Sequence, residues 1–337
     1  MADLAYLTRI LRTPLELNNV KPGERVMILT DTGIDPSLWQ AAQAAATELG
    51  AEPMVTIMNR RESHTRNPPQ PLIAAGIDPE TDLCLYLTST AMAHSDFSHQ
   101  MRDHLKRVVL MEELTPAMLE PGGPCTADYP ALYRLGKKIA DIFTAGDTVH
   151  VTCPNGTDLT AGIRGRMGRS IAGIPHPMGK GGTGCAFPDG EAHVCPEEGT
   201  GEGRIVFDLT AHSTGLLEEP LILTVEKGFV TRVEGGRGAA IWRDLLERRP
   251  DPNNYNCPAE IAIGLNPRVT PTGLMRTDKK KYGAAHIGVG DTIALGGACH
   301  ANVRLEGVID RPEISVDGQV LTRGGDILID EWNTRES

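Results

Sequence analysis

The chain has 337 residues, 40% of them hydrophobic, which is enough for two domains of ordinary size or one large domain. Its net charge is −11 and only 4% of its residues are aromatic, which argues against nucleic acid as a partner. No apolar run is long enough to cross a bilayer, so we expect no membrane insertion.

The N-terminal segment and the cysteines indicate the cellular compartment of the protein. Residues 4–15 carry leucine and isoleucine at helical spacing with charged residues between them, which predicts an amphipathic helix and not a signal peptide. The seven cysteines are scattered and contain no C-x-x-C pair, which is typical of reduced thiols. We therefore expect a cytoplasmic protein.

Apolar runs and alanine-rich segments alternate along the first 150 residues. The predicted strands are 25–29, 53–58, 82–88, 108–111 and 148–152, and the predicted helices are 38–49, a segment from 115, and 129–142. This alternation predicts an α/β domain over residues 1–150, with a doubly wound, mostly parallel sheet covered by helices on both faces.

His94 follows the predicted strand at 82–88. Open α/β sheets place their sites at the carboxyl ends of the strands, so we predict a catalytic role for His94. The alternative is a solvated helix start in which Ser95 or Asp96 is the cap. The loop after the first strand, TDTGIDPS, lacks the glycine spacing that a pyrophosphate needs, so we predict no nucleotide there.

The character of the chain changes near residue 150, where glycine becomes dense and alternating patterns dominate. The predicted strands are 204–209, 221–226, 229–233 and 313–316, and the one convincing helix is 239–246. We expect an α+β, mostly β, domain over residues 151–337 that binds a metal, for the reasons that follow.

Three candidate ligands lie in short apolar runs broken by glycine, namely Glu260, His286 and His300. A carboxylate with two imidazoles is a usual set of ligands for a divalent metal in an enzyme. Upstream, Glu191 directly follows a glycine turn in FPDGEAHVCP. A strand that begins there would put Glu191, His193 and Cys195 on one face. For each histidine alone, an ordinary core or surface position is the alternative.

This set of segments resembles the aminopeptidase T family of metallopeptidases, in which the matching motifs supply a two-metal site. The resemblance implies four metal ligands and leaves His193 and Cys195 as bystanders. The implied ligands are Glu191, Glu260, His286 and His300. The family's final H-x-D is His300-Ala301-Asn302 here, and a neutral Asn302 favours one metal, or two with unequal affinity.

The stretch from GEGRIVFDL to GLNPR is also similar to 2,5-dihydroxypyridine 5,6-dioxygenase, which opens a pyridine ring with non-haem Fe(II). Residues 226–236 and the overall length are closer to this family, and its AHS-like element matches His94-Ser95. Its iron is held by two histidines and one aspartate. Here Glu260 stands at one histidine position and Asn302 at the aspartate position.

From the four ligands that the aminopeptidase T resemblance implies, we expect a metal-dependent hydrolase using Zn, Mn or Co. A metal-activated water would attack a small amide, lactam or amino-substituted aromatic, and His94 would donate a proton to the leaving group. The alternatives are the Fe(II) ring-cleaving dioxygenase and a ligand-binding protein that has lost catalysis. Arg268 and Arg304 flank the ligand segments and, with Asn302, are candidates for contacting a small substrate. The resemblance also implies a homo-oligomer.

Overall fold

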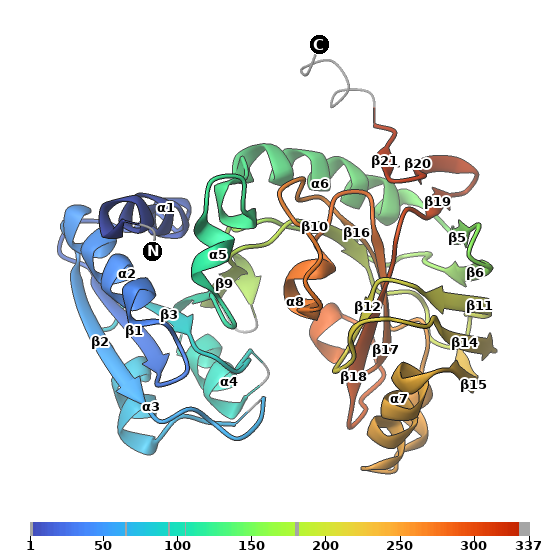
Figure 1. Cartoon of the computed structure of the whole chain (residues 1–337), viewed down its shortest axis with the longest axis horizontal. Helices are drawn as coiled ribbons and strands as arrows, with labels where there is room; N and C mark the ends of the chain where they lie inside the picture. The colour runs from blue at the N-terminus through green and yellow to red at the C-terminus, as the bar shows by residue number, and fades with distance from the viewer. Residues whose placement is uncertain (1–2, 65, 94, 105, 179–181, 330–337) are drawn as a thin grey trace. The chain divides into compact units, whose positions relative to one another are not determined.

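The computed structural model describes residues 3–64, 66–93, 95–104, 106–178 and 182–329. The chain forms two compact units, and each is built from two separate stretches (Figure 1). The first comprises Met1–Pro130 and Ala172–Asp189, and the second comprises Ala131–Ile171 and Gly190–Ser337. These units do not coincide with the segments 1–150 and 151–337, and a division into two domains at residue 150 stays a prediction.

The first unit contains a six-stranded sheet with the order β2-β1-β3-β4-β9-β8. Its strands are β1 (Arg25–Asp31), β2 (Glu52–Met58), β3 (Leu83–Leu87), β4 (Arg107–Leu110), β8 (His176–Met178) and β9 (Gly182–Ala186). All neighbours are parallel except β8, which runs antiparallel to β9. The predicted doubly wound, mostly parallel sheet is confirmed, and β8 and β9 join it from beyond residue 150.

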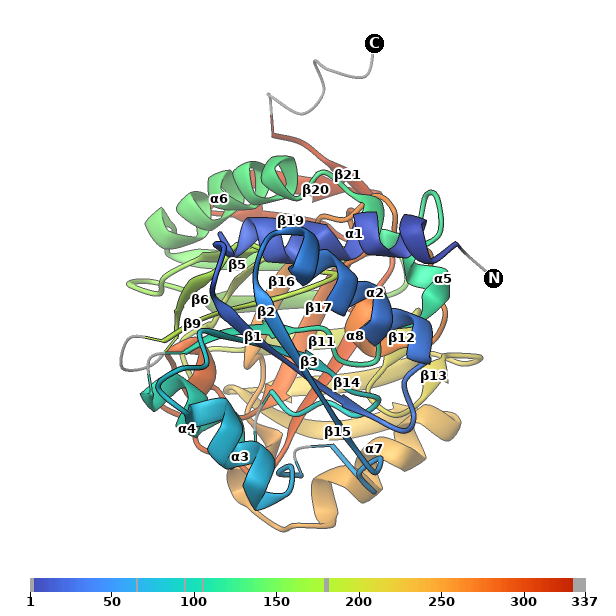
Figure 2. The same ribbon diagram turned by 90° about the vertical axis from the view of Figure 1, so that its left-hand side faces the viewer.

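Helices cover both faces of this sheet. Figure 2 looks at the sheet from its β2 edge, with α1 and α2 on one side of the strands and α3 and α4 on the other. The helices are α1 (Leu4–Leu17), α2 (Pro36–Glu48), α3 (Gln70–Ile77), α4 (Asp96–Asp103), α5 (Pro116–Leu119) and α6 (Tyr129–Ala145), of which α6 runs on into the second unit. Asp35 begins α2, because its carboxylate accepts the Ser37 N–H and Pro36 is preset for the first turn.

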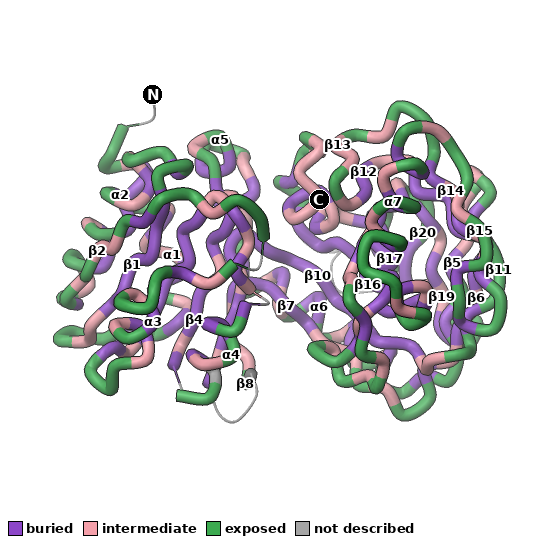
Figure 3. Tube along the Cα trace, turned by 90° about the horizontal axis from the view of Figure 1, so that it is seen from below, coloured by how far each residue is buried: buried purple, intermediate pink, exposed green. Residues whose placement is uncertain are grey.

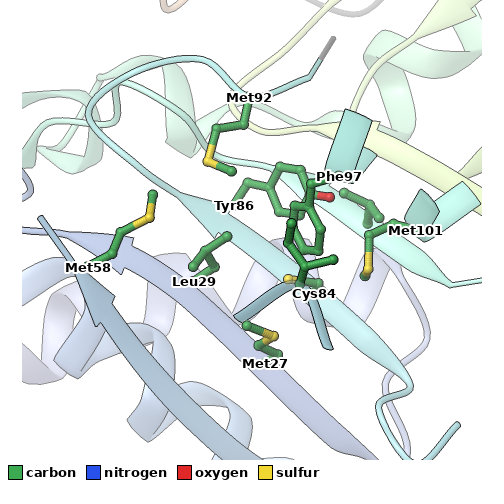
Figure 4. Packing of buried hydrophobic residues seen from close by; sticks show 10 residues of the cluster. Met27, Leu29, Met58, Cys84, Tyr86, Met92, Phe97 and Met101 are labelled. Atoms are coloured by element: carbon green, nitrogen blue, oxygen red, sulfur yellow. The ribbon is translucent and has the colours of Figure 1, made fainter. Parts of the chain in front are cut away.

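The face under α3 and α4 is packed with methionine and aromatic side chains (Figure 4). Strand alternation points Met27 of β1 and Tyr86 of β3 to this face, where Phe97 and Met101 of α4 meet them. The Tyr86 and Phe97 rings stack with centroids 5.4 Å apart. Gly76 of α3 makes room for this stack, since a Cβ there would lie 2.8 Å from the Phe97 ring.

Two antiparallel sheets form the second unit. Their strand orders are β13-β12-β18-β17-β16-β10-β7 and β15-β14-β11-β6-β5-β19-β20-β21. The strands of the seven-stranded sheet are β7 (Arg169–Ile171), β10 (Glu191–Val194), β12 (Thr210–Ala211), β13 (Gly215–Leu216), β16 (Glu260–Gly264), β17 (Ala285–Gly290) and β18 (Arg304–Ile309).

The eight-stranded sheet contains two tight turns, at Lys227-Gly228 and at Asp317-Gly318. Its strands are β5 (Thr148–Cys153), β6 (Thr157–Gly162), β11 (Glu202–Phe207), β14 (Leu221–Glu226), β15 (Phe229–Gly235), β19 (Glu313–Val316), β20 (Gln319–Arg323) and β21 (Asp326–Ile327). The helices α7 (Arg237–Glu247) and the four-residue α8 (Met275–Asp278) join the greater part of α6 in this unit. The β-rich character predicted for this half is confirmed.

Burial singles out the middle of the seven-stranded sheet. Every residue of β10, β16 and β17 is buried, and Figure 3 shows β10 in the buried colour. A strand that is buried on both faces normally carries only apolar side chains, so polar side chains there need a specific reason. Within the described residues, no helix is long and apolar enough to span a membrane.

The Tyr86–Phe97 stack supports a prediction about stability. Phe97→Ala leaves a cavity under α4 and should lower the free energy of unfolding by about 3–5 kcal/mol. Phe229→Ala is the control, because Phe229 is 42% exposed and should change stability by less than about 0.5 kcal/mol. Calorimetric unfolding of both variants measures the difference, and a loss below about 1 kcal/mol for Phe97→Ala would contradict the packing described.

Candidate metal centre

Four neighbouring strands place ionisable side chains on one face of the seven-stranded sheet. Glu191 and His193 of β10 stand opposite Gly264 and Ala262 of β16, and Ala262 in turn stands opposite His286 of β17. Residues directly opposite each other in a sheet project to the same face, so both imidazoles and the Glu191 carboxylate share it.

The same face carries Glu260 of β16 and Glu306 of β18, which stand on either side of Gly288 of β17. A Cβ at Gly288 would lie 3.1 Å from the Glu260 Cβ, so a larger residue would crowd the carboxylate. The glycines and alanines that interrupt these apolar runs therefore leave space between the polar side chains.

The imidazoles lie between the carboxylates. The Nδ1 atom of His193 is 3.5 Å from Glu191 Oε1 and 3.2 Å from Glu260 Oε1. The Nε2 atom of His286 is 3.6 Å from Glu191 Oε2 and 3.7 Å from Glu260 Oε2. Two groups of possible ligands result, Glu191–His193–Glu260 and Glu260–His286–Glu306, each with its ligand atoms within 4.8 Å of one another.

Three cations face the three carboxylates, of which Lys280 is buried and Lys279 and Arg304 are half-buried. Lys280 forms an ion pair with Glu191, and Arg304 forms one with Glu260. Lys279 Nζ donates to Glu306 Oε2 at 2.6 Å, and Arg304 Nη2 lies 3.2 Å from Glu306 Oε1. Each carboxylate of the cluster therefore has a positive partner from the protein itself.

Gly264 brings the two lysines to the strands. The backbone after α8 runs so close to Gly264 that a Cβ there would lie 2.1 Å from the Lys281 carbonyl oxygen. Asn266 N–H donates to the Lys280 carbonyl at 2.9 Å and holds this segment in place. Glycine at 264 is thus required for Lys279 and Lys280 to reach the carboxylates.

The cations keep the carboxylates ionised. Burial by itself raises the pKa of a carboxyl, but the positive neighbours outweigh it for all three glutamates. Lys280 lowers the pKa of Glu191 well below its usual range, and Lys279 does the same for Glu306. Arg304 is the main cause that brings the pKa of Glu260 to about 2.

The donors of the cluster fit a divalent metal. None of the four ring nitrogens of His193 and His286 has a hydrogen-bond partner of good geometry in the described part of the chain, although both rings are buried. A buried imidazole without such a partner is costly, and carboxylate oxygens lie within reach of the same point. Imidazole and carboxylate together suit first-row transition metals.

The structure brings together three of the four residues that the sequence predicts as ligands, Glu191, Glu260 and His286. It does not bring His300 to them, since His300 is exposed in the segment before β18 and its carbonyl accepts from Asn253 Nδ2. Arg304 is the residue of that segment that reaches the cluster, because β18 begins there. A role for His300 as a ligand stays a prediction.

The other predicted site residues lie apart from the cluster or are not described. Asn302 and Arg268 are exposed, and their backbone N–H groups donate to Asn254 Oδ1 and Asn266 Oδ1, respectively. His94 lies outside the described residues, so its catalytic role stays a prediction.

Sequence reasoning set aside His193 and did not single out Glu306, Lys279 or Lys280. The two-residue spacing from Glu191 already places His193 on the same face, and that signal could have found it. Glu306 and the lysines have no such signal, because strand register and the close approach at Gly264 bring them to the site.

Comparisons with known proteins decide between the two families that the sequence resembles. The family model of 2,5-dihydroxypyridine 5,6-dioxygenase matches residues 6–288. The chain belongs to this family. The curated 2,5-dihydroxypyridine 5,6-dioxygenase of Pseudomonas putida is 27% identical over 161 residues, which is 43% of this chain. The match spans 45% of that relative, or about half of its length.

Solved structures show the same fold. The 2,5-dihydroxypyridine dioxygenase of Pseudomonas putida KT2440 superposes with a TM-score of 0.79 and 20% identity, over 98% of this chain and 99% of that one. Wild-type AmpT from Thermus thermophilus superposes with a TM-score of 0.71 and 17% identity, over 95% of this chain and 99% of that one. Both resemblances read from the sequence are thus confirmed.

The expectation of a metal-dependent hydrolase is wrong. The family model and the curated relative both describe a dioxygenase, whereas the likeness to AmpT at 17% identity shows the fold alone. The error has a physical source, because carboxylates and imidazoles on a shared scaffold suit both kinds of metal chemistry.

The segment that carries His300 supports a prediction about pH. Glu198 Oε1 accepts from Thr292 Oγ1 at 2.9 Å and from the Ala298 N–H at 2.7 Å, and Arg166 binds its other oxygen. Burial raises the pKa of Glu198, but the Ala298 N–H and the other donors outweigh it and lower the pKa to about 2.

Glu198→Gln should therefore lower the free energy of unfolding by about 1.5–3 kcal/mol at pH 7. Because the folded pKa is below the ordinary value of about 4.3, the wild-type advantage is complete above that pH and disappears as pH falls toward 2. Unfolding curves between pH 7 and pH 2 measure this. Glu226→Gln, on an exposed residue, is the control, and an equal loss at all pH values would contradict the assignment.

Proposed function

We propose that this protein is a metal-dependent, ring-cleaving oxygenase that acts on a small hydroxylated nitrogen heteroaromatic, of the type named by its family. Membership of the family over residues 6–288 is the observation that carries this proposal. The buried cluster of carboxylates and imidazoles supports it, since such donors suit Fe(II). A bound Fe(II) would supply the activation of O₂ that the protein's own side chains lack.

Glu191, His193 and Glu260 would hold the metal, and His286 with Glu306 stands beside them. This set has one imidazole and two carboxylates, the reverse of the two histidines and one aspartate implied by the family resemblance. The strands present these side chains rigidly, because β10, β16 and β17 are buried along their whole length. Burial also limits the access of water to the reacting atoms.

The protein's own cations would position the ligands. Lys280 and Arg304 contact the Oε2 atoms of Glu191 and Glu260, which leaves the Oε1 atoms directed at His193. Partners of this kind fix the orientation of metal-binding carboxylates. A cytoplasmic location, a homo-oligomeric state and proton transfer by His94 remain predictions.

The first experiment is to purify the protein without oxygen, measure its metal content and follow O₂ uptake with 2,5-dihydroxypyridine. We expect Fe(II) to restore uptake in metal-stripped protein. Zn²⁺ should bind without supporting uptake, because it has no redox chemistry. Absence of uptake with the metal bound would contradict the proposed reaction.

A pair of variants tests which residues hold the metal. His193→Ala should weaken Fe(II) binding at least about 100-fold, since loss of an outer partner alone typically costs 10–100-fold. His300→Ala is the matched control and should leave the affinity within about threefold, because its side chain is exposed. Anaerobic titration measures both dissociation constants. A large loss of affinity in His300→Ala with little change in His193→Ala would instead assign the metal to the segment before β18.

A further inference from the structure

The buried cluster is electrically balanced before any metal enters. Three carboxylates (Glu191, Glu260 and Glu306) face three cations (Lys280, Arg304 and Lys279), and all six side chains are at most 18% exposed. The formal charges of these six side chains sum to zero, apart from the two imidazoles of His193 and His286. Two carboxylate ligands without such partners would instead offset both charges of a divalent ion.

The geometry lets the cations stay in place when a metal binds. Lys280 and Arg304 occupy the Oε2 sides of Glu191 and Glu260. The Oε1 atoms, which lie 3.5 and 3.2 Å from His193 Nδ1, are the ones that converge on a common point. A metal between the Oε1 atoms and the imidazole therefore does not need to displace either cation.

We propose that Lys280 and Arg304 determine the charge of the loaded centre and thereby its substrate. Because they cancel the ligating carboxylates, a divalent metal keeps both of its positive charges, and the site selects a small ligand that binds as a dianion. A doubly deprotonated dihydroxy-heteroaromatic is such a ligand. This inference rests on the proposed function and names the charge state of its substrate.

The physical reason is the cost of an unbalanced charge in a buried site. Water cannot screen the excess charge well, because Glu260 and His286 are only 3% and 0% exposed at their side chains. A ligand with two negative charges restores the balance, whereas a ligand with one leaves half of the excess. The pair of Lys279 and Glu306 adds no net charge and does not alter this comparison.

The test uses Lys280→Met, which removes one of the two cations and keeps the aliphatic stem. The matched control is the neighbouring Lys281→Met, whose Nζ pairs with Asp310 Oδ1 at 2.6 Å and not with the cluster. Wild-type and variant chains are stripped of metal and titrated with Co²⁺, and the loaded proteins are then titrated with oxalate, a dianion, and glycolate, a monoanion of similar size.

Lys280→Met should bind Co²⁺ at least tenfold more tightly than wild type, because Glu191 then lacks its internal counter-charge. The ratio of oxalate to glycolate affinity should fall at least tenfold. Lys281→Met should stay within threefold of wild type in both measurements. Lys280→Arg keeps the charge and should shift both quantities less than Lys280→Met does. Should Lys280→Met not fold, Arg304→Gln removes the cation at Glu260 and should give the same two shifts.

Two results would overturn the proposal and leave the proposed function intact. The first is that Lys280→Met leaves the Co²⁺ affinity and the oxalate to glycolate ratio unchanged. The second is that Lys280→Arg changes them as much as Lys280→Met does, which would assign the effect to packing and not to charge. A wild-type chain that takes up no Co²⁺ would overturn the proposed function and this proposal together.

Discussion

The second unit depends on the mutual compensation of buried charges across one face of its seven-stranded sheet. Glu191, Glu260 and Glu306 come from three strands, and their cationic partners come from β18 and from the segment after α8. A buried charge that loses its partner costs several kcal/mol, so no member of this network is independent of the others. The network therefore fixes the positions of these strands and of the segment after α8 relative to one another.

Small residues make that network possible. Ala262, Gly264 and Gly288 stand where larger side chains would fill the space between the ionisable groups or push the lysine backbone away. Their cost is a loss of apolar contact in the middle of a buried sheet. A fold that accepts this cost over the two adjacent strands β16 and β17 has a polar centre and not an apolar core at that place, which is typical of a functional site.

Burial separates the cluster from the segment that carries His300. The segment from 291 to 303 carries the H-x-N motif, but its described contacts to Glu198 and Asn253 hold it outside the cluster, with His300 exposed. His193 supplies the imidazole next to Glu260 instead. The solved structures therefore support the fold, while the contacts within this chain place His193 beside Glu260.

The sequence by itself determined the alternating layers of the first unit, the β-rich character of the second and three residues of the candidate centre. These features depend on local patterns, such as apolar runs, turn residues and spacing along one strand. Sequence did not reveal β8 and β9, because these strands are only three and five residues long and join the first sheet from far along the chain.

Only the tertiary structure decided that Glu306, Lys279 and Lys280 join the candidate cluster and that the His300 side chain is exposed outside it. Register across β16, β17 and β18 sets which side chains share a face, and the contact at Gly264 sets how near the lysines come. Both depend on residues far apart in the chain, and no local pattern encodes the distance between them.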